Sequence, residues 1–287
     1  MNGFFIVDKP MGITSQQVVN QIKRKFQLKK CGHNGTLDPN ATGVMVIACN
    51  EATKLMKFLN EHDKEYETTI CFGYTSNTLD VWGNVSEEGS MEFTVEDLDS
   101  ALEALKLRTS QIPPMVSAIK VKGKKLYEYE RAHQTVEVKP REVKLYDVVR
   151  YSDLRWANGH LEVDVKLHCS KGFYVRSFAR DLGELLGGKA IITSLRRTRS
   201  GKFSLACAQP LLELSLNDFL TIEQLFPDFS FLEVNDFVAK LASNGVVLDE
   251  RQIKTNQPFY IVHNHAIIAL YECVDIYKYK PLIIFKK

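Results

Sequence analysis

The chain has 287 residues, 45% of them hydrophobic, with 37 Lys and Arg against 35 Asp and Glu and a formal net charge of +2. This length allows one large core or two domains, and a charged fraction of 25% is that of a folded chain, which excludes a disordered one. Purely apolar stretches are short, such as 44–49, so no segment approaches the roughly 20 residues of a membrane-spanning helix.

Hydrophobic spacing along the chain predicts a mixture of strands and helices. Alternating or continuous apolar residues predict strands, whereas apolar residues three and four apart predict one buried face of a helix. In chain order the pattern predicts a strand at 4–10, a helix at 14–26, a strand at 43–49, a helix at 51–60, a strand at 66–75, a helix at 94–105, a strand at 159–170 and a helix at 174–187. Pro10 ends the first strand, and Thr14 or Ser15 is a suitable N-cap for the first helix.

These elements do not follow the regular strand–helix–strand rhythm of a parallel sheet. We therefore expect an α+β fold with a mixed, largely antiparallel central sheet flanked by helices. The clearest boundary lies near Pro227, where acidic and aromatic residues precede a β-rich tail. The sequence thus predicts a small C-terminal β-rich domain.

Charge is distributed in blocks along the chain. Residues 61–105 contain one Lys or Arg against twelve acids, 106–150 contain eleven against five, and 166–202 contain nine against two. Blocks of this size predict one basic face and one acidic face, and a basic face is the electrostatic footprint of a protein that binds a polyanion such as nucleic acid. On charge alone, solvated faces without a partner are an equally good interpretation.

Cysteine and histidine usage gives no sign of a disulfide framework or a metal site. The six cysteines, at positions 31, 49, 71, 169, 207 and 273, form no CxxC pair, which is typical of reduced thiols in a cytoplasmic protein. The close pairs Cys31 with His33 and His263 with His265 have no partners at ligand spacing. We therefore expect no metal. The N-terminus lacks the basic start and cleavage site of a secretory signal, so we also expect a cytoplasmic protein.

The segment "CGHNGTLDPNATGV" (31–44) combines three glycines, one histidine and a single carboxylate, that of Asp38. It lacks the Gly-Lys-Ser/Thr and the strand–GxGxxG–helix layout of phosphate-binding loops. Two interpretations remain. The segment is a turn in which glycine permits unusual backbone angles, or it is a catalytic loop that holds one carboxylate at a substrate. Composition alone favours the turn.

Five motifs, in the same order along the chain, resemble those of the TruB family of pseudouridine synthases. The loop "GHNGTLDPNATG" is similar to the family's G-H-T-G-T-L-D-P-x-A-T-G, with Asn34 where the family usually has Thr. Four other segments are also similar to family motifs: "DKPMGITS", "EATKLMKFLNEHDKEYETTICFG", "PPMVSAIKVKGKKLYEYER" and "CSKGFYVRSFARDLGELLG".

The resemblance implies a domain organisation and an activity. It implies a pseudouridine synthase fold over 1–228, with an RNA-gripping insert at about 106–150, followed by a small PUA-like RNA-binding domain at 229–287. It implies isomerisation of uridine to pseudouridine at position 55 in the T-arm of tRNA, by base flipping, without a guide RNA and without a cofactor or metal. We then expect tRNA as the partner, no membrane and no obligate protein partner, with a monomer as the simplest state.

The matched positions imply the catalytic roles. Asp38 resembles the family's catalytic carboxylate, which acts as a nucleophile or as the base that initiates glycal formation. Arg176 resembles its cationic partner, because a carboxylate in a closed pocket needs a positive charge to stay ionised, and Asp80 holds Arg176 from the other side. Tyr66 matches the tyrosine that stacks on the target base and is a candidate for the proton step at C5.

Other matched positions imply contacts with the substrate. Tyr174 and Leu195 line the base pocket, and His33 occupies the stack that the flipped base vacates. Lys9 supports the loop or contacts RNA. The insert mixes lysine with tyrosine, as expected of a segment that grips RNA, and its candidates for backbone contact are Lys122, Lys124 and Lys125. A solvated basic helix is the alternative interpretation of the insert.

Two other functions stay open. An RNA-binding or tRNA-folding protein without essential catalysis would tolerate the loss of Asp38, whereas the intact set of Asp38, Tyr66 and Arg176 favours an enzyme. A guide-RNA-dependent synthase subunit would share the loop, but such proteins usually carry longer basic extensions than this sequence has.

Overall fold

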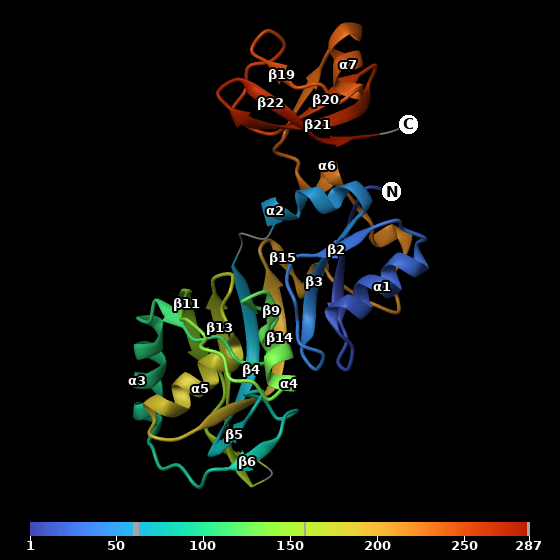
Figure 1. Cartoon of the computed structure of the whole chain (residues 1–287). Helices are drawn as coiled ribbons and strands as arrows, with labels where there is room; N and C mark the ends of the chain where they lie inside the picture. Colours follow the sequence, from blue (N-terminus) through green and yellow to red (C-terminus); the bar gives the residue numbers. More distant parts are fainter. Residues whose placement is uncertain (60–62, 158, 286–287) are drawn as a thin grey trace.

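Figure 1 shows the computed structural model of the chain, which describes residues 1–59, 63–157 and 159–285. A large sheet with helices packed on it forms the lower part of the view, and a small β-rich unit drawn in orange and red lies above it. No helix within the described ranges is long and apolar enough to cross a membrane.

The large sheet has eleven strands in the described part of the chain. Its main path runs through β11 (Leu145–Arg150), β13 (His160–Cys169), β4 (Lys64–Phe72), β14 (Ala190–Ser200), β3 (Thr42–Cys49), β1 (Gly3–Lys9) and β16 (Gln209–Pro210). Neighbours on this path are antiparallel, except that β14 with β3 and β1 with β16 are parallel. The predicted α+β class with a mixed, largely antiparallel sheet is therefore confirmed.

Shorter strands extend this sheet or pair with each other. Four of them join the main path: β2 (Cys31–His33), β12 (Arg155–Ala157), β15 (Phe203–Ser204) and β17 (Leu220–Thr221). Three separate pairs are β5 (Tyr74–Ser76) with β6 (Val85–Glu87), β7 (Ser110–Gln111) with β10 (Arg141–Glu142), and β8 (Lys120–Val121) with β9 (Lys124–Lys125). Because β7 pairs with β10, the two ends of the predicted insert lie side by side.

Three longer helices of the large unit begin where their sequences predict. They are α1 (Ser15–Lys25), α3 (Val95–Lys106) and α5 (Val175–Leu185). Thr14 is the N-cap of α1: its hydroxyl accepts a hydrogen bond from Gln17 N at 3.1 Å, and Thr14 N donates to Gln17 Oε1 at 2.7 Å. Thr94 and Asp97 form the same reciprocal arrangement at α3. Such caps satisfy backbone donors that a helix start leaves free, worth about 1 kcal/mol each.

The helices α3 and α5 share one apolar core with the sheet (Figure 1). Leu98 and Leu102 of α3 lie in the same buried cluster as Val163 and Leu167 of β13, and Phe178 of α5 joins them. Burial of each such side chain contributes about 1.5–3 kcal/mol. The alternation of apolar residues predicted for 159–170 therefore marks the face of β13 that these helices cover.

Two predicted elements differ from the structure. The helix predicted at 51–60 is a 3₁₀ turn, η1 (Asn50–Leu55), followed by one α-helical turn, α2 (Met56–Leu59), while residue 60 lies outside the described residues. The strand predicted at 66–75 is interrupted at Gly73, which has a φ of +82°. A Cβ at this position would lie 2.5 Å from the carbonyl oxygen of Gly89, so only glycine fits where the chain passes from β4 to β5.

The C-terminal segment forms its own five-stranded sheet. Its elements are β18 (Ser230–Glu233), α7 (Asp236–Ser243), β19 (Leu248–Asp249), β20 (Phe259–His263), β21 (Ala266–Asp275) and β22 (Lys278–Ile284). Three short helices precede it: η2 (Leu205–Cys207), η3 (Leu216–Asp218) and α6 (Ile222–Leu225). Tyr260 and Ile283 of this sheet share a buried cluster with Leu55 and Leu225, so apolar packing continues across the predicted boundary at 228. That boundary and the PUA-like assignment stay predictions.

Lys9, the last residue of β1, anchors the loop of residues 34–41, which we call the Asp38 loop. Its side chain is fully buried, and its Nζ donates to the carbonyl oxygens of Pro10 at 2.9 Å, Pro39 at 2.8 Å and Ala41 at 2.6 Å. Burial lowers the pKa of Lys9 to about 8, while the nearby charge of Asp38 acts in the opposite direction. Lys9 therefore supports the loop, and its burial leaves no surface for the alternative, a direct contact with RNA.

The start of α1 holds the same loop from another side. Ser15 Oγ donates to the carbonyl oxygen of Leu37 at 2.9 Å and accepts from Leu37 N at 2.8 Å. Gly12 N donates to the carbonyl oxygen of Pro39 at 2.9 Å. Asp38 thus sits between Leu37, which is bonded to the first residue of α1, and Pro39, which is bonded to the segment that precedes this helix.

Replacement of Lys9 by Met should destabilise the fold, because three carbonyl oxygens lose their donor while the apolar stem is kept. We expect Lys9→Met to lower the free energy of unfolding by about 2–4 kcal/mol in urea titrations. Lys23→Met, on the exposed face of α1, is the matched control and should change it by less than about 0.5 kcal/mol. Equal stabilities of the two variants would contradict the anchoring role of Lys9.

Candidate active site

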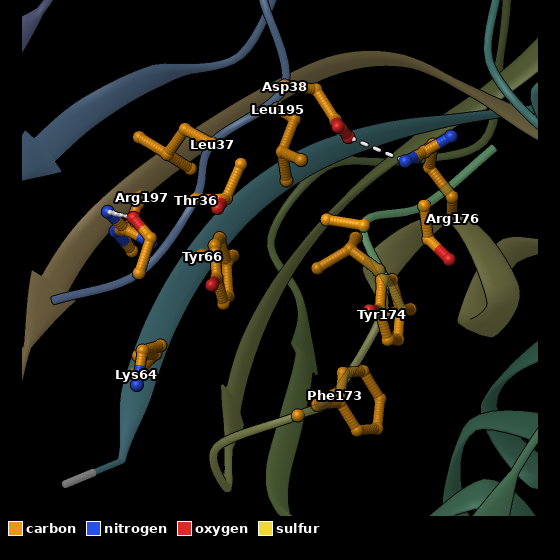
Figure 2. Close-up of a pocket in the computed structure, with 15 residues that line it drawn as sticks. Thr36, Leu37, Asp38, Lys64, Tyr66, Phe173, Tyr174, Arg176, Leu195 and Arg197 are labelled. Atoms are coloured by element: carbon orange, nitrogen blue, oxygen red, sulfur yellow. Dashed lines mark hydrogen bonds and ion pairs between the residues drawn. The ribbon is translucent and has the colours of Figure 1, made fainter. Parts of the chain in front are cut away.

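A cavity of about 260 Å³ opens where the Asp38 loop, β4, β14 and the start of α5 meet (Figure 2). Its walls include Asp38, Tyr66, Tyr174, Arg176, Leu195 and Arg197. The structure therefore brings together five of the residues proposed from the sequence, from four separate segments. The sixth, Arg197, was not among them.

Arg176 forms an ion pair with Asp38 at the mouth of this cavity. Arg176 Nη2 lies 2.9 Å from Asp38 Oδ2 (Figure 2). The Arg176 side chain is 5% exposed, whereas that of Asp38 is 39% exposed. On its other side Arg176 Nη1 lies 3.8 Å from Asp80 Oδ2. The guanidinium thus stands between two carboxylates, as the resemblance implies.

Backbone carbonyls hold this guanidinium in place. Arg176 Nη1 donates to the carbonyl oxygen of Thr78 at 2.7 Å, and Nη2 donates to that of Val116 at 2.9 Å. Asp80 is fixed in turn, because its Oδ1 accepts from Thr78 Oγ1 at 2.6 Å and from Trp82 N at 3.1 Å. Arg176 therefore has little freedom to leave Asp38.

The pKa of Asp38 is raised above its ordinary value. Burial against the protein wall is the main cause, the nearby charge of Asp80 adds to it, and Arg176 opposes both. The ion pair therefore controls the fraction of Asp38 that is ionised at a given pH. An ionised carboxylate facing a cavity of this kind can act as a nucleophile or as a general base.

Tyr66 projects from β4 toward the cavity (Figure 2). Its side chain is buried, and burial raises the pKa of the phenol, while a hydrogen bond with Arg197 acts against this shift. Tyr66 is consequently a neutral phenol at neutral pH. It offers the cavity a ring face and a protonated hydroxyl rather than a free phenolate.

Arg197 lies opposite Tyr66 in the register of β14 and β4 and is 1% exposed. Its Nε donates to the carbonyl oxygen of Val44 at 2.7 Å, and its Nη2 donates to that of Gly35 at 3.2 Å. The parallel strands β3 and β14 approach each other closely at Gly43, which has a φ of +110°. A Cβ at this position would lie 2.1 Å from the Arg197 carbonyl oxygen, so the position requires glycine. Arg197 joins β14, β3 and the Asp38 loop behind the tyrosine.

The opposite wall of the cavity is apolar and aromatic. Tyr174, the residue before α5, lines it, whereas Leu195 on β14 lies two residues from Arg197 and so lines the cavity on the same sheet face as Tyr66. Tyr174 is held by Gln111, a residue that the sequence did not indicate: Tyr174 N donates to Gln111 Oε1 at 2.9 Å, and Gln111 Nε2 donates to the Tyr174 carbonyl oxygen at 3.2 Å. Burial raises the pKa of Tyr174, so this phenol is also neutral.

The insert contributes to the same wall and carries an exposed basic hairpin. Ala118 lines the cavity, and the β8–β9 hairpin follows directly. Lys122 and Gly123, with φ of +49° and +86°, form its two-residue turn. Lys124 Nζ lies 5.9 Å from the ring centre of Tyr129. The basic residues 122–125 therefore lie on a hairpin and not on a helix, and a short helix, α4 (Leu126–Arg131), follows them. Lys122 and Lys124 are exposed, so the helix of the alternative interpretation is wrong here but its solvated basic residues are not.

Lys125 lies on the same hairpin, and its Nζ is 5.4 Å from the ring centre of Tyr127. Each of these two lysines thus lies near an aromatic ring of α4. Ammonium groups and rings arranged in this way suit phosphates and unstacked bases together.

His33 lies on β2 and is not among the described residues that line the cavity. Its Nδ1 accepts a hydrogen bond from Gly35 N at 3.3 Å. Burial and the charge of Arg197 lower the pKa of His33, so the imidazole is neutral at neutral pH. A neutral ring at the edge of the Asp38 loop is suited to stacking rather than to ion pairing.

Within the described residues, no group of three or more His, Cys, Asp and Glu side chains is placed to hold a metal ion. The groups at the cavity that can take part in chemistry are the Asp38 carboxylate, the two phenols, the two guanidinium groups, the ammonium of Lys64 and the hydroxyls of Thr36 and Ser117. The Asp38 carboxylate is thus surrounded by cationic and aromatic side chains.

Curated relatives resemble the chain over nearly its whole length. It is 38% identical to "tRNA pseudouridine synthase B" of Aster yellows witches'-broom phytoplasma, with 99% of this chain and 100% of the relative covered. The protein of the same name from Acholeplasma laidlawii is also 38% identical, over 99% of this chain and 100% of the relative. That of Mycobacterium sp. (strain KMS) is 45% identical over 73% of this chain and 70% of the relative.

Solved structures share the fold. A chain in the "Crystal Structure of a Cbf5-Nop10-Gar1 Complex" aligns with a TM-score of 0.66 at 21% identity, covering 99% of this chain and 84% of that one. A chain in the "Crystal structure of the archaeal box H/ACA sRNP Nop10-Cbf5 complex" aligns with a TM-score of 0.61 at 20% identity, covering 99% and 85%. At these identities the likeness concerns the fold alone.

The family itself is given by the sequence match and by the relatives. Residues 23–175 match the family described as "TruB family pseudouridylate synthase (N terminal domain)". That match spans more than half of the chain, and the relatives above extend the similarity to almost all of it. The chain therefore belongs to the TruB family of pseudouridylate synthases, which are isomerases.

Proposed function

We propose that this enzyme isomerises uridine to pseudouridine at position 55 in the T-arm of tRNA, without a guide RNA. The observation that carries the proposal is the Asp38–Arg176 pair, 2.9 Å apart, at a cavity walled by Tyr66, Tyr174 and Leu195. Relatives that this chain matches over 99% of its length are named tRNA pseudouridine synthase B, which supports tRNA as the substrate.

The chemistry needs one carboxylate. The N-glycosidic bond of uridine breaks, the uracil turns within the cavity, and its C5 bonds to the sugar carbon. Since the leaving base is also the incoming nucleophile, no water has to be activated, whereas glycoside hydrolysis normally uses two carboxylates. Asp38 acts ionised, either as the nucleophile on the substrate or as the base that initiates glycal formation. Arg176 keeps it charged during this step.

The aromatic and apolar walls hold the base while it turns. Tyr66 stacks on the uracil, Leu195 packs beside Tyr66 on the same sheet face, and Tyr174 confines the base from the start of α5. Because burial raises the pKa of Tyr66, its phenol is a proton donor or hydrogen-bond partner in the ground state. For Tyr66 to accept the proton from C5 of the base, the phenol therefore has to pass its own proton to another group in the same step.

The target base has to leave its stack before it can enter the cavity. The uridine of a folded T-arm is enclosed by its neighbours, so the enzyme extrudes it and offers a replacement. His33, neutral and at the edge of the Asp38 loop, takes the vacated place in this proposal. The basic hairpin at 120–125 grips the phosphates beside the flipped nucleotide.

The alternatives differ in what they require of the chain. A tRNA-folding protein without chemistry requires neither the ion pair of Asp38 nor the cavity beside it. A guide-dependent subunit would act within an RNA–protein assembly, and one of the solved structures named above is titled as part of a box H/ACA sRNP. We propose instead a monomer that acts on free tRNA in the cytoplasm. Purified protein, a T-arm transcript, no guide RNA and detection of pseudouridine separate these three possibilities.

Removal of the Asp38 carboxylate should abolish pseudouridine formation and leave tRNA binding nearly intact. Binding arises mainly from phosphate contacts elsewhere, whereas the reaction needs the ionised oxygen. We expect Asp38→Ala and Asp38→Asn to lose activity with less than about a threefold change in Kd, well under the 1.4 kcal/mol of a tenfold change. Asp153→Ala, at a fully exposed carboxylate, is the control and should keep full activity. Appreciable turnover by Asp38→Ala would reject Asp38 as the catalytic residue.

Arg176 should serve the chemical step by keeping Asp38 ionised. Arg176→Lys keeps the charge but cannot reach both carboxylates and both carbonyls with one compact ammonium, so the single-turnover rate should fall much more than binding. Arg176→Met should be slower still. Because Arg176 lowers the pKa of Asp38, its loss raises that pKa further, and the low-pH limb of the rate profile should move to higher pH. Rates that agree within about twofold for all three proteins across pH would rule out this role.

The basic hairpin should contribute to binding through phosphates. Lys124→Glu with Lys125→Glu should weaken tRNA binding and reduce the log–log salt slope by roughly 0.7–0.9 for each lost contact, with little effect on the rate at saturating enzyme. The same reversal at Lys166 and Lys189, on the open sheet face and after the C-terminal end of α5, is the control. An unchanged slope in the hairpin variant would mean that this segment does not touch the RNA backbone.

A further inference from the structure

Two cysteines face each other across the strands that flank the Asp38 loop. Cys31 on β2 and Cys49 on β3 are direct partners in the antiparallel ladder. The next pair outward is hydrogen-bonded, since Asn50 N donates to the Lys30 carbonyl oxygen at 2.7 Å. Because bonded and non-bonded pairs alternate, the cysteines form a non-hydrogen-bonded pair, in which Cα atoms lie about 4.5 Å apart and side chains are closest. A disulfide accepts Cα separations of about 4.4–6.8 Å.

The two thiols differ in access. Cys49 is fully buried in the apolar core, whereas Cys31 is half-buried at its rim and packs against the same cluster. Cys49 lowers the pKa of the Cys31 thiol, and the pKa of Cys49 is raised in return, so a thiolate forms preferentially on the accessible sulfur. An oxidant therefore meets the more reactive sulfur first, with a second thiol directly behind it.

We propose that Cys31 and Cys49 are a redox-sensitive pair, which a low-molecular-weight disulfide oxidises to a disulfide that closes residues 31–49 into a ring around Asp38. In the first step the Cys31 thiolate attacks the small disulfide, forms a mixed disulfide and releases one small thiolate. In the second step Cys49, after loss of its proton, attacks the Cys31 sulfur and expels the other. Two protein thiols are oxidised, and the small disulfide takes up the two electrons as two thiols.

The bond between Cys31 and Cys49 is a reversible one and not a permanent structural disulfide. A reducing cytoplasm keeps the thiols apart, and the bond forms when the pool of small disulfides rises. The strands are already paired, so closure asks little change of their backbones. The ring removes freedom from the unfolded chain and should raise the midpoint of thermal unfolding by several degrees, roughly 5 °C. It spans the whole Asp38 loop, which is otherwise held by hydrogen bonds from Lys9 and Ser15 and by the ion pair of Asp38 with Arg176.

The sequence makes the test direct. No Lys or Arg lies between Lys30 and Lys54, so trypsin releases residues 31–54 as one peptide with both cysteines and no third. Native protein is treated with oxidised glutathione, alkylated without reduction and digested. We expect this peptide to be two hydrogens lighter and unalkylated, and to take two alkyl groups after reduction. The oxidised protein should also show the higher unfolding midpoint.

Variants separate the pair from other thiol chemistry. Cys31→Ser, at the less buried position, should abolish both the lighter peptide and the rise in the unfolding midpoint, whereas Cys207→Ser, at an exposed cysteine, should keep both. A peptide that carries only glutathione on Cys31, or two alkyl groups without reduction, would overturn the proposal. A rise in midpoint that persists in Cys31→Ser would do the same. These readouts do not depend on the proposed activity.

Discussion

The buried guanidinium of Arg176 is the contact on which the rest of the site depends. Its two terminal nitrogens meet acceptors from the Asp38 loop, from the turn at 78–80 and from residue 116 of the insert, while α5 carries the side chain itself. An uncompensated buried cation costs several kcal/mol, so every segment that supplies an acceptor is held in place by the same charge. One side chain thereby joins four parts of the sequence, the first and last of which are more than 130 residues apart, and leaves one carboxylate facing the cavity.

Two further buried cations complete this arrangement. Arg197 binds carbonyl oxygens of β3 and of the Asp38 loop behind Tyr66, and Lys9 binds three carbonyl oxygens at the far side of the loop. Both cations are satisfied by neutral acceptors, and the charge of Lys9 favours the ionised form of Asp38. Part of the excess of basic residues at 166–202 is therefore buried at the cavity, namely Arg176 and Arg197, and does not contribute to a basic surface.

How much the sequence predicts depends on whether the signal is local. The helices α1 and α3 and the strand β13 show their own periods and caps, and they were predicted nearly to the residue. The central strand β14 was not predicted, because "SLRRTRS" has the composition of a surface segment and Arg197 is buried through contacts with residues distant in the sequence. The meeting of Asp38, Asp80 and Arg176 came from a family resemblance, since no period in the sequence connects them. That resemblance carried no information on Gln111, which fixes Tyr174 through two hydrogen bonds.

The site combines a rigid half with a loosely packed half, and the division follows from burial. On the Asp38 side, backbone and side-chain bonds from Lys9, Ser15 and Gly12 leave the carboxylate few orientations. On the insert side, Leu126 is the only buried residue between 120 and 140, and the elements are two short strands and a helix of six residues. A segment with so little buried apolar surface opens at a small free-energy cost. The proposed reaction needs this combination, because holding a reacting carboxylate still requires preorganisation, whereas admitting a folded RNA requires a wall that can open.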